Sequence, residues 1–208
     1  MNLNRIKTGP RLTLGFGLVL ALMALMVAIG YTRLVSSEKA LHHLVDLERR
    51  AGVANEWRAL TELNAARTFA IAKSGNNTAV VEYFDPLIKA TSAEISRRQD
   101  DLSKAVDSDR GKELLAKVAT ERSAYVATRD EVFKMLKTGD PAGAGKVLAE
   151  RMAPAAQSYI GAIAALANYQ GERVEKDGAQ VQRELQAAEM QLLVLLGIGL
   201  VVAAGAGW

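Results

Sequence analysis

Residues 109–138 read DRGKELLAKVATERSAYVATRDEVFKMLKT, and their side-chain pattern is typical of one helix in a bundle. Steps of three and four residues select one stripe along this segment. Its members are Leu115, Val118, Arg122, Tyr125, Arg129, Val132 and Leu136. Such alternating steps place side chains on the helix face that packs against neighbouring helices. Two arginines and a tyrosine interrupt the stripe in the middle, so this seam is not entirely apolar.

Short breaks on both sides of this helix divide the chain into four helical segments. Ser108 precedes it as a candidate N-cap, and after it Gly139 ends the helix while Asp140 caps the next one. A third break lies at Ser74–Asn77. These breaks predict helices over residues 33–74, 78–107, 109–138 and 140–190.

The segments contain no sustained alternation of β-branched residues, so strand signals are lacking. Short connections make consecutive helices antiparallel. The sequence therefore predicts an all-α protein, an antiparallel up-down-up-down four-helix bundle with a transmembrane helix at each end. Pro86, early in the second helix, is expected to kink it.

The N-terminal end carries the first predicted membrane span. Residues 12–31 read LTLGFGLVLALMALMVAIGY, and twenty helical residues cover about 30 Å, the thickness of a bilayer core. Residues 1–11 form a short stub that carries Arg5, Lys7 and Arg11 and no acid, which places it in the cytoplasm. The alternative is a cleaved signal peptide, whose apolar region is usually shorter, about 7–15 residues.

The C-terminal end carries the second predicted span, over residues 191–208. Its run LLVLLGIGLVVAAGAGW contains no charge and reaches Trp208 with no polar flank. We expect the natural protein to continue beyond Trp208 into the cytoplasm; the alternative is a membrane helix that ends the protein. Residues 32–190 then lie outside the cytoplasm, in the periplasm of a two-membrane bacterium, and the protein resides in the inner (cytoplasmic) membrane.

Composition excludes several classes of function. The net charge is +3 with acids and bases interspersed, which argues against a nucleic-acid partner, and the chain has no cysteine. It also lacks a Glu-x-x-His pair, a Gly-rich phosphate loop and an evident Ser-His-Asp set. We therefore expect no enzyme activity, no catalytic residue, no metal site and no cofactor. The adjacent His42 and His43 indicate an exposed polar pair.

The stripes of the other three helices also contain polar exceptions. Folding the chain at its breaks brings these exceptions to about the height of Arg122 and Tyr125 in the third helix. They are Thr61, Thr91, Tyr159 and, one turn away, Arg58. The sequence thus predicts a polar layer within the bundle.

Arginines in this layer predict a ligand. The stripes offer no Asp or Glu at the same height, and an unpaired buried charge costs several kcal/mol. A bound anion would supply the missing charge, because guanidinium groups bind carboxylates in a bidentate manner. Several arginines favour a ligand with more than one carboxylate. The candidate ligand-binding residues are Arg122, Tyr125, Arg129, Thr91, Tyr159, Arg58, Thr61 and, on a neighbouring face, Arg67.

Each arginine also has an alternative interpretation that involves no ligand. An Arg side chain at a seam position can extend along an apolar stem to solvent. It can also pair near the surface with Glu121, Asp130 or Glu131.

The order of these features resembles a known family. A basic stub, a membrane helix, a four-helix bundle and a second membrane helix look like the input half of bacterial methyl-accepting chemotaxis receptors of the four-helix-bundle type. The opening NRIKTGPRLTLGFG at residues 4–17 is similar to their usual start. The resemblance covers the whole chain.

The resemblance implies a homodimer, or a higher homo-oligomer, that packs along the first and last helices and binds amino acids or organic acids. Ligand would shift the last helix slightly, and the cytoplasmic part would control a histidine kinase through its adaptor. In aspartate-sensing members, arginines of the first helix hold ligand at the distal dimer interface. Arg67 and Thr68 are the nearest matches here. The stripe of residues 109–138 points instead to a site within one bundle.

We therefore expect the input domain of a chemoreceptor for di- or tricarboxylates such as malate, succinate or citrate. One alternative is the same module in a sensor histidine kinase or a cyclic-dinucleotide enzyme. Another is a bundle that binds no ligand and serves as a structural or protein-interaction element.

Overall fold

The computed structural model describes residues 8–207, which contain helices and turns and no strand. The helices are α1 (Thr8–Lys73), α2 (Thr78–Ala105), α3 (Asp109–Lys137), α4 (Pro141–Val147) and α5 (Ala153–Gly207), with a π-helical segment at Leu148–Met152 between α4 and α5. The three breaks fall where the sequence predicts them, and the all-α four-helix bundle is confirmed.

Local sequence chemistry fixes these breaks. Asn77, Ser108 and Asp140 cap α2, α3 and α4, each accepting a hydrogen bond from a backbone N–H two or three residues further on. Gly139 follows α3 with φ +80°, a conformation that costs glycine little. Pro141 takes the first turn of α4, where its missing N–H is no loss.

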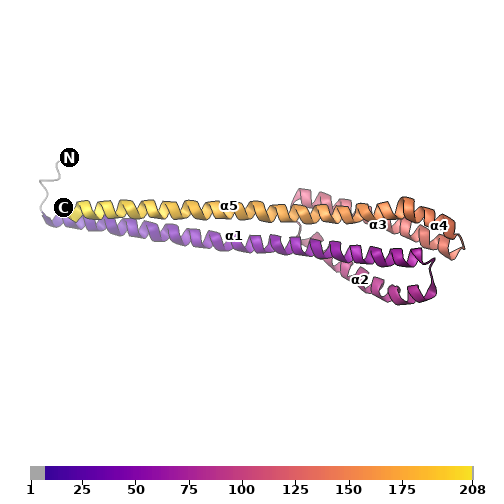
Figure 1. The fold of residues 1–208 in the computed structure, drawn as a ribbon. Coiled ribbons are helices and arrows are strands. Elements are labelled where there is room, and N and C mark those ends of the chain that lie inside the picture. The colour runs from indigo at the N-terminus through magenta and orange to yellow at the C-terminus, as the bar shows by residue number, and fades with distance from the viewer. Residues whose placement is uncertain (1–7, 208) are drawn as a thin grey trace. The chain divides into compact units, whose positions relative to one another are not determined.

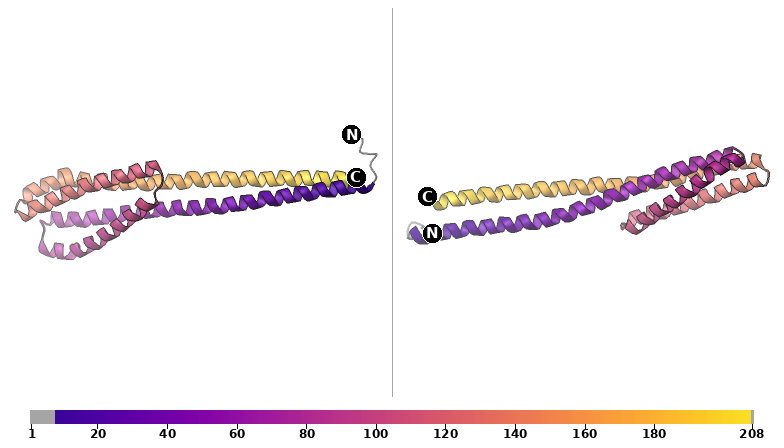
Figure 2. Two further views of the ribbon diagram at one scale, coloured as in Figure 1. Left: turned by 180° about the vertical axis from the view of Figure 1, so that it is seen from behind. Right: turned by 90° about the horizontal axis from the view of Figure 1, so that it is seen from below.

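The described chain divides into two compact units, and each is considered by itself. One unit comprises Asp46–Val174, in which α2, α3 and the parts of α1 and α5 within that range run antiparallel to their chain neighbours (Figure 1). Its core contains the fully buried side chains of Trp57, Leu102, Val118 and Val132. Figure 2 shows the same arrangement from behind and from below.

The first and last bundle helices continue into the predicted membrane spans. α1 runs without a break through residues 12–31 and on to Lys73, and α5 runs without a break through the predicted boundary at residues 190 and 191. The physical reason is that neither junction contains a proline or a capping motif that would end a helix.

The π segment differs from the sequence prediction, which was one regular helix over residues 140–190. The buried residues Ala144, Leu148, Met152 and Ala156 follow one another at steps of four. Each residue of an α-helix turns by about 100°, so three such steps drift by about 120° around the helix. The wider turn at Leu148–Met152, closed by a hydrogen bond from Ala153 N–H to the Leu148 carbonyl, keeps these side chains on one face.

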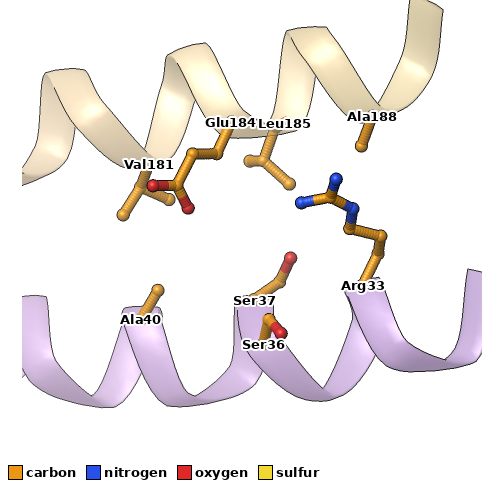
Figure 3. Close-up of a pocket in the computed structure, with 8 residues that line it drawn as sticks. All are labelled: Arg33, Ser36, Ser37, Ala40, Val181, Glu184, Leu185 and Ala188. Atoms are coloured by element: carbon orange, nitrogen blue, oxygen red, sulfur yellow. The ribbon is translucent and has the colours of Figure 1, made fainter. Parts of the chain in front are cut away.

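The other compact unit contains residues up to Val45 and from Glu175 onward. Here α1 and α5 lie side by side, and Figure 3 shows Arg33 of α1 pointing toward Leu185 and Ala188 of α5. The Arg33 Nη2 donates to Gln191 Oε1 at 3.2 Å, and His43 Nε2 lies 3.1 Å from Asp177 Oδ2.

Both helices of this unit contain a stretch long and apolar enough to cross a membrane, judged by length and composition. Large apolar side chains are exposed along them, with Val27 and Val201 exposing 72% and 73% of their surface. Two candidate membrane-spanning helices therefore flank the bundle. Residues 1–7 of the predicted N-terminal stub and Trp208 of the second predicted span lie outside the described residues.

Candidate functional site

A small cavity inside the bundle brings five of the eight predicted site residues together. It has a volume of about 60 Å³ and lies between α1, α2, α3 and α5. Thr61 comes from α1 and Tyr159 from α5, while α3 contributes the remaining three, Arg122, Tyr125 and Arg129. These five residues of the predicted polar layer therefore line one cavity in the folded chain.

Two tyrosines form the buried floor of this cavity. The rings of Tyr125 and Tyr159 stack with centroids 6.1 Å apart and an interplanar angle of 22°. The indole Nε1 of Trp57 donates to the Tyr159 hydroxyl at 3.3 Å. The Thr61 hydroxyl donates a hydrogen bond to the Trp57 carbonyl at 2.9 Å. These contacts tie α1, α3 and α5 together beneath the cavity.

The environment of Tyr125 keeps its phenol protonated. Burial raises the pKa of Tyr125, and the neighbouring Tyr159 acts in the same direction. A hydrogen bond with Thr68 and the positive charge of Arg129 partly offset this rise in pKa. A neutral phenol can donate to an anion, so Tyr125 suits a ligand-binding role.

The rim of the cavity is basic. Arg122 Nη1 donates to Gln99 Oε1, across to α2. Arg129 donates through Nε and Nη2 to the same oxygen of Asp130, at 2.9 and 2.7 Å. The surface pairing with Asp130 considered from the sequence is thus present, whereas Glu131 pairs with Arg151 instead.

Arg67 and Thr91 lie beside the cavity and do not line it. Arg67 Nη1 donates to Thr91 Oγ1 at 2.7 Å and to the Leu87 carbonyl at 3.3 Å. Their sequence neighbours Thr68 and Ser92 are cavity residues. These two predicted residues therefore contact each other across α1 and α2, one position away from the lining.

Arg58 is not brought to the site. Its side chain is 44% exposed and its Nε lies 4.0 Å from Glu62 Oε1. Trp57 occupies the core position in its place, with no exposed surface. Steps of three and four from Ala54 to Thr61 admit either residue, and burying the large indole removes more apolar surface from water than burying an arginine. The size of Trp57 was the signal that could have corrected the sequence prediction.

Asn64 and Ser92 are site residues that sequence reasoning missed. The Asn64 Nδ2 donates to Ser92 Oγ at 2.9 Å, and both residues line the cavity. The Asn64 Oδ1 is buried without a hydrogen-bond partner. Asn64 lies three residues after Thr61 and four before Thr68, so its place on the same helical stripe could have revealed it.

The charges around the cavity do not balance. Within residues 8–207, Arg67 and Arg122 have no carboxylate within 4.0 Å, and only Arg129 among the three arginines has one. A surplus of positive charge next to neutral hydroxyl groups favours an anion. Across the same residues, no group of three or more His, Asp or Glu side chains could hold a metal ion.

Comparison with known proteins identifies the family of this chain. A search of curated proteins returned no significant match. The family model described as a four helix bundle sensory module for signal transduction matches residues 5–184, most of the chain. The chain belongs to this family, the four-helix-bundle sensory modules of chemotaxis receptors.

Proposed function

We propose that the bundle is the input domain of a transmembrane chemoreceptor that binds a small anionic solute, a di- or tricarboxylate, on the periplasmic side. The observation that carries this proposal is the shared cavity of Arg122, Arg129, Tyr125, Thr61 and Tyr159. Family membership makes the chain a signalling input domain rather than a typical catalytic one.

The chemistry of the lining matches a carboxylate. Each guanidinium offers a planar fork of donors that fits two carboxylate oxygens. Arg122 and Arg129 now satisfy part of this capacity with Gln99 and Asp130, both of which a ligand carboxylate can replace. Because the two arginines lie seven residues apart on α3, about two helical turns, each can bind a separate carboxylate of one ligand through its long side chain.

The volume of the cavity sets a condition on binding. A water needs about 15 Å³ on this measure, so 60 Å³ holds roughly four waters and not a whole dicarboxylate. Ligand entry therefore requires outward movement of the arginine side chains at the rim. Long, partly exposed arginine side chains make that movement inexpensive.

The proposed signal passes through α1 and α5. Both helices contribute to the cavity, and both contain a candidate membrane span. The basic residues before the first span favour a cytoplasmic N-terminus, which supports the proposed periplasmic position of the bundle. In this proposal a homodimer in the inner membrane transmits the ligand signal to a cytoplasmic histidine kinase.

The test uses the whole chain, residues 1–208, in lipid nanodiscs. Malate, succinate and citrate are titrated by calorimetry against the intact bundle. We expect at least one of them to bind, and Arg122→Ala and Arg129→Ala each to weaken that binding at least tenfold. Arg110→Ala is the matched control, because Arg110 lies on α3 and pairs with Glu113 at the surface. Absence of binding by all three acids to a folded bundle would refute the proposed ligand class.

A bundle without a ligand remains a second candidate, favoured by the internal partners of Arg122 and Arg129. Thermal unfolding distinguishes the two functions. A ligand at one hundred times its Kd stabilises the folded state by about 2.7 kcal/mol, and a bundle that binds none of the acids keeps its melting temperature.

A further inference from the structure

An open groove adjoins the cavity on the side of α2. It has a volume of about 600 Å³, within the ~300–1,000 Å³ range of small-molecule sites. The groove and the cavity share Thr68, Ser92 and Arg129 in their linings. The Arg129 side chain, held by Asp130, therefore stands between the two spaces, and its movement would join them.

Four of the twelve residues that line this groove are large and apolar, and the other eight are polar or charged. The four apolar residues are Ile71 of α1, Val81 and Ile88 of α2, and Phe133 of α3. These side chains come from three different helices and face one space, so an apolar group placed there would contact all three. Such a group would leave water on binding, which is favourable in proportion to the area buried.

The charges in the groove are mostly neutralised. Lys89 Nζ lies 2.7 Å from Asp85 Oδ2, and Arg129 Nη2 lies 2.7 Å from Asp130 Oδ1. Lys137 also lines the groove, and in residues 8–207 no carboxylate lies within 4.0 Å of its amine. One unpaired cation beside four large apolar side chains favours an anion that also carries apolar surface.

Size points in the same direction. The inner cavity has room for roughly four waters, so most of any dicarboxylate must lie outside it. The adjoining groove is the space that Arg129 already borders. A ligand that reaches Arg129 from this side places its carboxylate at the cavity and its carbon body against Ile88 and Phe133.

We propose that the cavity and the groove form one binding site and that its ligand is a dicarboxylate with an apolar body. This inference rests on the proposed function and deepens it, because it names the part of the ligand that the arginines do not bind. The groove residues Ile71, Val81, Ile88 and Phe133 then set ligand specificity, while the arginines supply charge recognition.

Two probes that differ only by an apolar group test this inference on the unaltered chain. Succinate and phenylsuccinate carry the same pair of carboxylates, and the second adds a phenyl ring. Calorimetric titration of residues 1–208 in nanodiscs, with empty nanodiscs as the blank, should give about tenfold or tighter binding for phenylsuccinate. Equal or weaker binding of phenylsuccinate, with succinate bound, overturns the inference and leaves the proposed function standing. Binding of neither probe, nor of malate or citrate, overturns both.

Adjacent valines locate the phenyl ring. Val80 and Val81 are half-buried neighbours on α2, and only Val81 lines the groove. Val81→Asn should remove most of the preference for phenylsuccinate over succinate, and Val80→Asn should retain it. Loss of the preference to the same extent in both variants, or in neither, overturns the placement of the apolar body in this groove.

Discussion

Asp107 lies in the turn between α2 and α3. It links α1 to α5, the two helices that contain the candidate membrane spans. Its Oδ1 accepts a hydrogen bond from Arg50 of α1 at 3.1 Å and another from Arg173 of α5 at 3.0 Å. The arginine side chains are only 12% and 21% exposed. Asp107→Asn removes the charge that both guanidinium groups share and keeps the size of the side chain.

The expected loss of stability follows from this exposure. The Asp107 side chain is 58% exposed, so each ion pair is screened by solvent and contributes about 0.2–1 kcal/mol. The two pairs share one oxygen and are not fully additive, which gives a total of about 1 kcal/mol. For a compact unit of this size, that loss lowers the melting temperature by about 3–5 °C.

The pH dependence provides a second signature. The hydrogen bond from Arg173 lowers the pKa of Asp107, the charge of Arg50 adds to this, and burial opposes it. A carboxyl whose pKa is depressed by folding contributes stability above its unfolded pKa of about 3.9 and loses it as the pH falls through the folded pKa. The stability difference between the native chain and Asp107→Asn should therefore be present at pH 7 and close as the pH falls from the unfolded pKa through the lower, folded pKa of Asp107.

Circular dichroism of the chain in nanodiscs measures both effects. Asp100→Asn is the matched control, because Asp100 is an exposed aspartate of α2, and no ion pair joins it to another residue within the described part of the chain. Equal melting temperatures of the native chain and Asp107→Asn at pH 7 would refute the reasoning. A difference that persists unchanged at low pH would show that the charge of Asp107 is not its source.

Four further substitutions test packing and burial within the bundle. Gly111→Ala should lower the free energy of unfolding by about 1–3 kcal/mol, because an added Cβ would lie 2.4 Å from Val106 Cγ1. At Gly145 an added Cβ meets nothing within 4 Å, so Gly145→Ala should raise the free energy of unfolding by about 0.5–1 kcal/mol. Urea unfolding measures both changes. Trp57→Phe should lower the free energy of unfolding by about 1–3 kcal/mol through the lost volume and indole hydrogen bond, and an unchanged urea midpoint would contradict its core position. Burial raises the pKa of Tyr125, so its contribution to stability is present below the unfolded pKa of about 10 and is lost as the pH rises through the folded pKa. In pH-dependent unfolding, the native chain should therefore lose stability more steeply than Tyr125→Phe above pH 10.

The sequence predicted helix ends correctly where the backbone there favours only a few residue types. Ser108, Asp140 and Gly139 marked helix ends because capping and positive φ select those side chains. The seven-residue spacing of Val118 and Val132 around Tyr125 predicted their burial, which the structure confirms. Local chemistry and helical period together were therefore sufficient for the bundle.

Sequence reasoning was weaker where two residues satisfied the same period. Trp57 and Arg58 both fit the spacing between Ala54 and Thr61, and only the packed core selects the indole. The π segment was also missed, because it depends on how α4 and α5 meet the rest of the core. The groove beside Phe133 has no sequence signature, since three helices form its walls.

Two separate contacts join α1 to α5 inside the compact unit Asp46–Val174, and they limit what a ligand can do. One is the hydrogen bond from Trp57 to Tyr159 below the cavity, and the other is the pair of arginines on Asp107. A ligand shifts these helices only by the difference between its affinities for the two arrangements, and such coupling energies are typically about 1–3 kcal/mol. The Asp107 contact, at about 1 kcal/mol, is weak enough for a bound anion to overcome. We therefore expect Asp107→Asn to make α1 and α5 easier to displace without altering the cavity residues themselves.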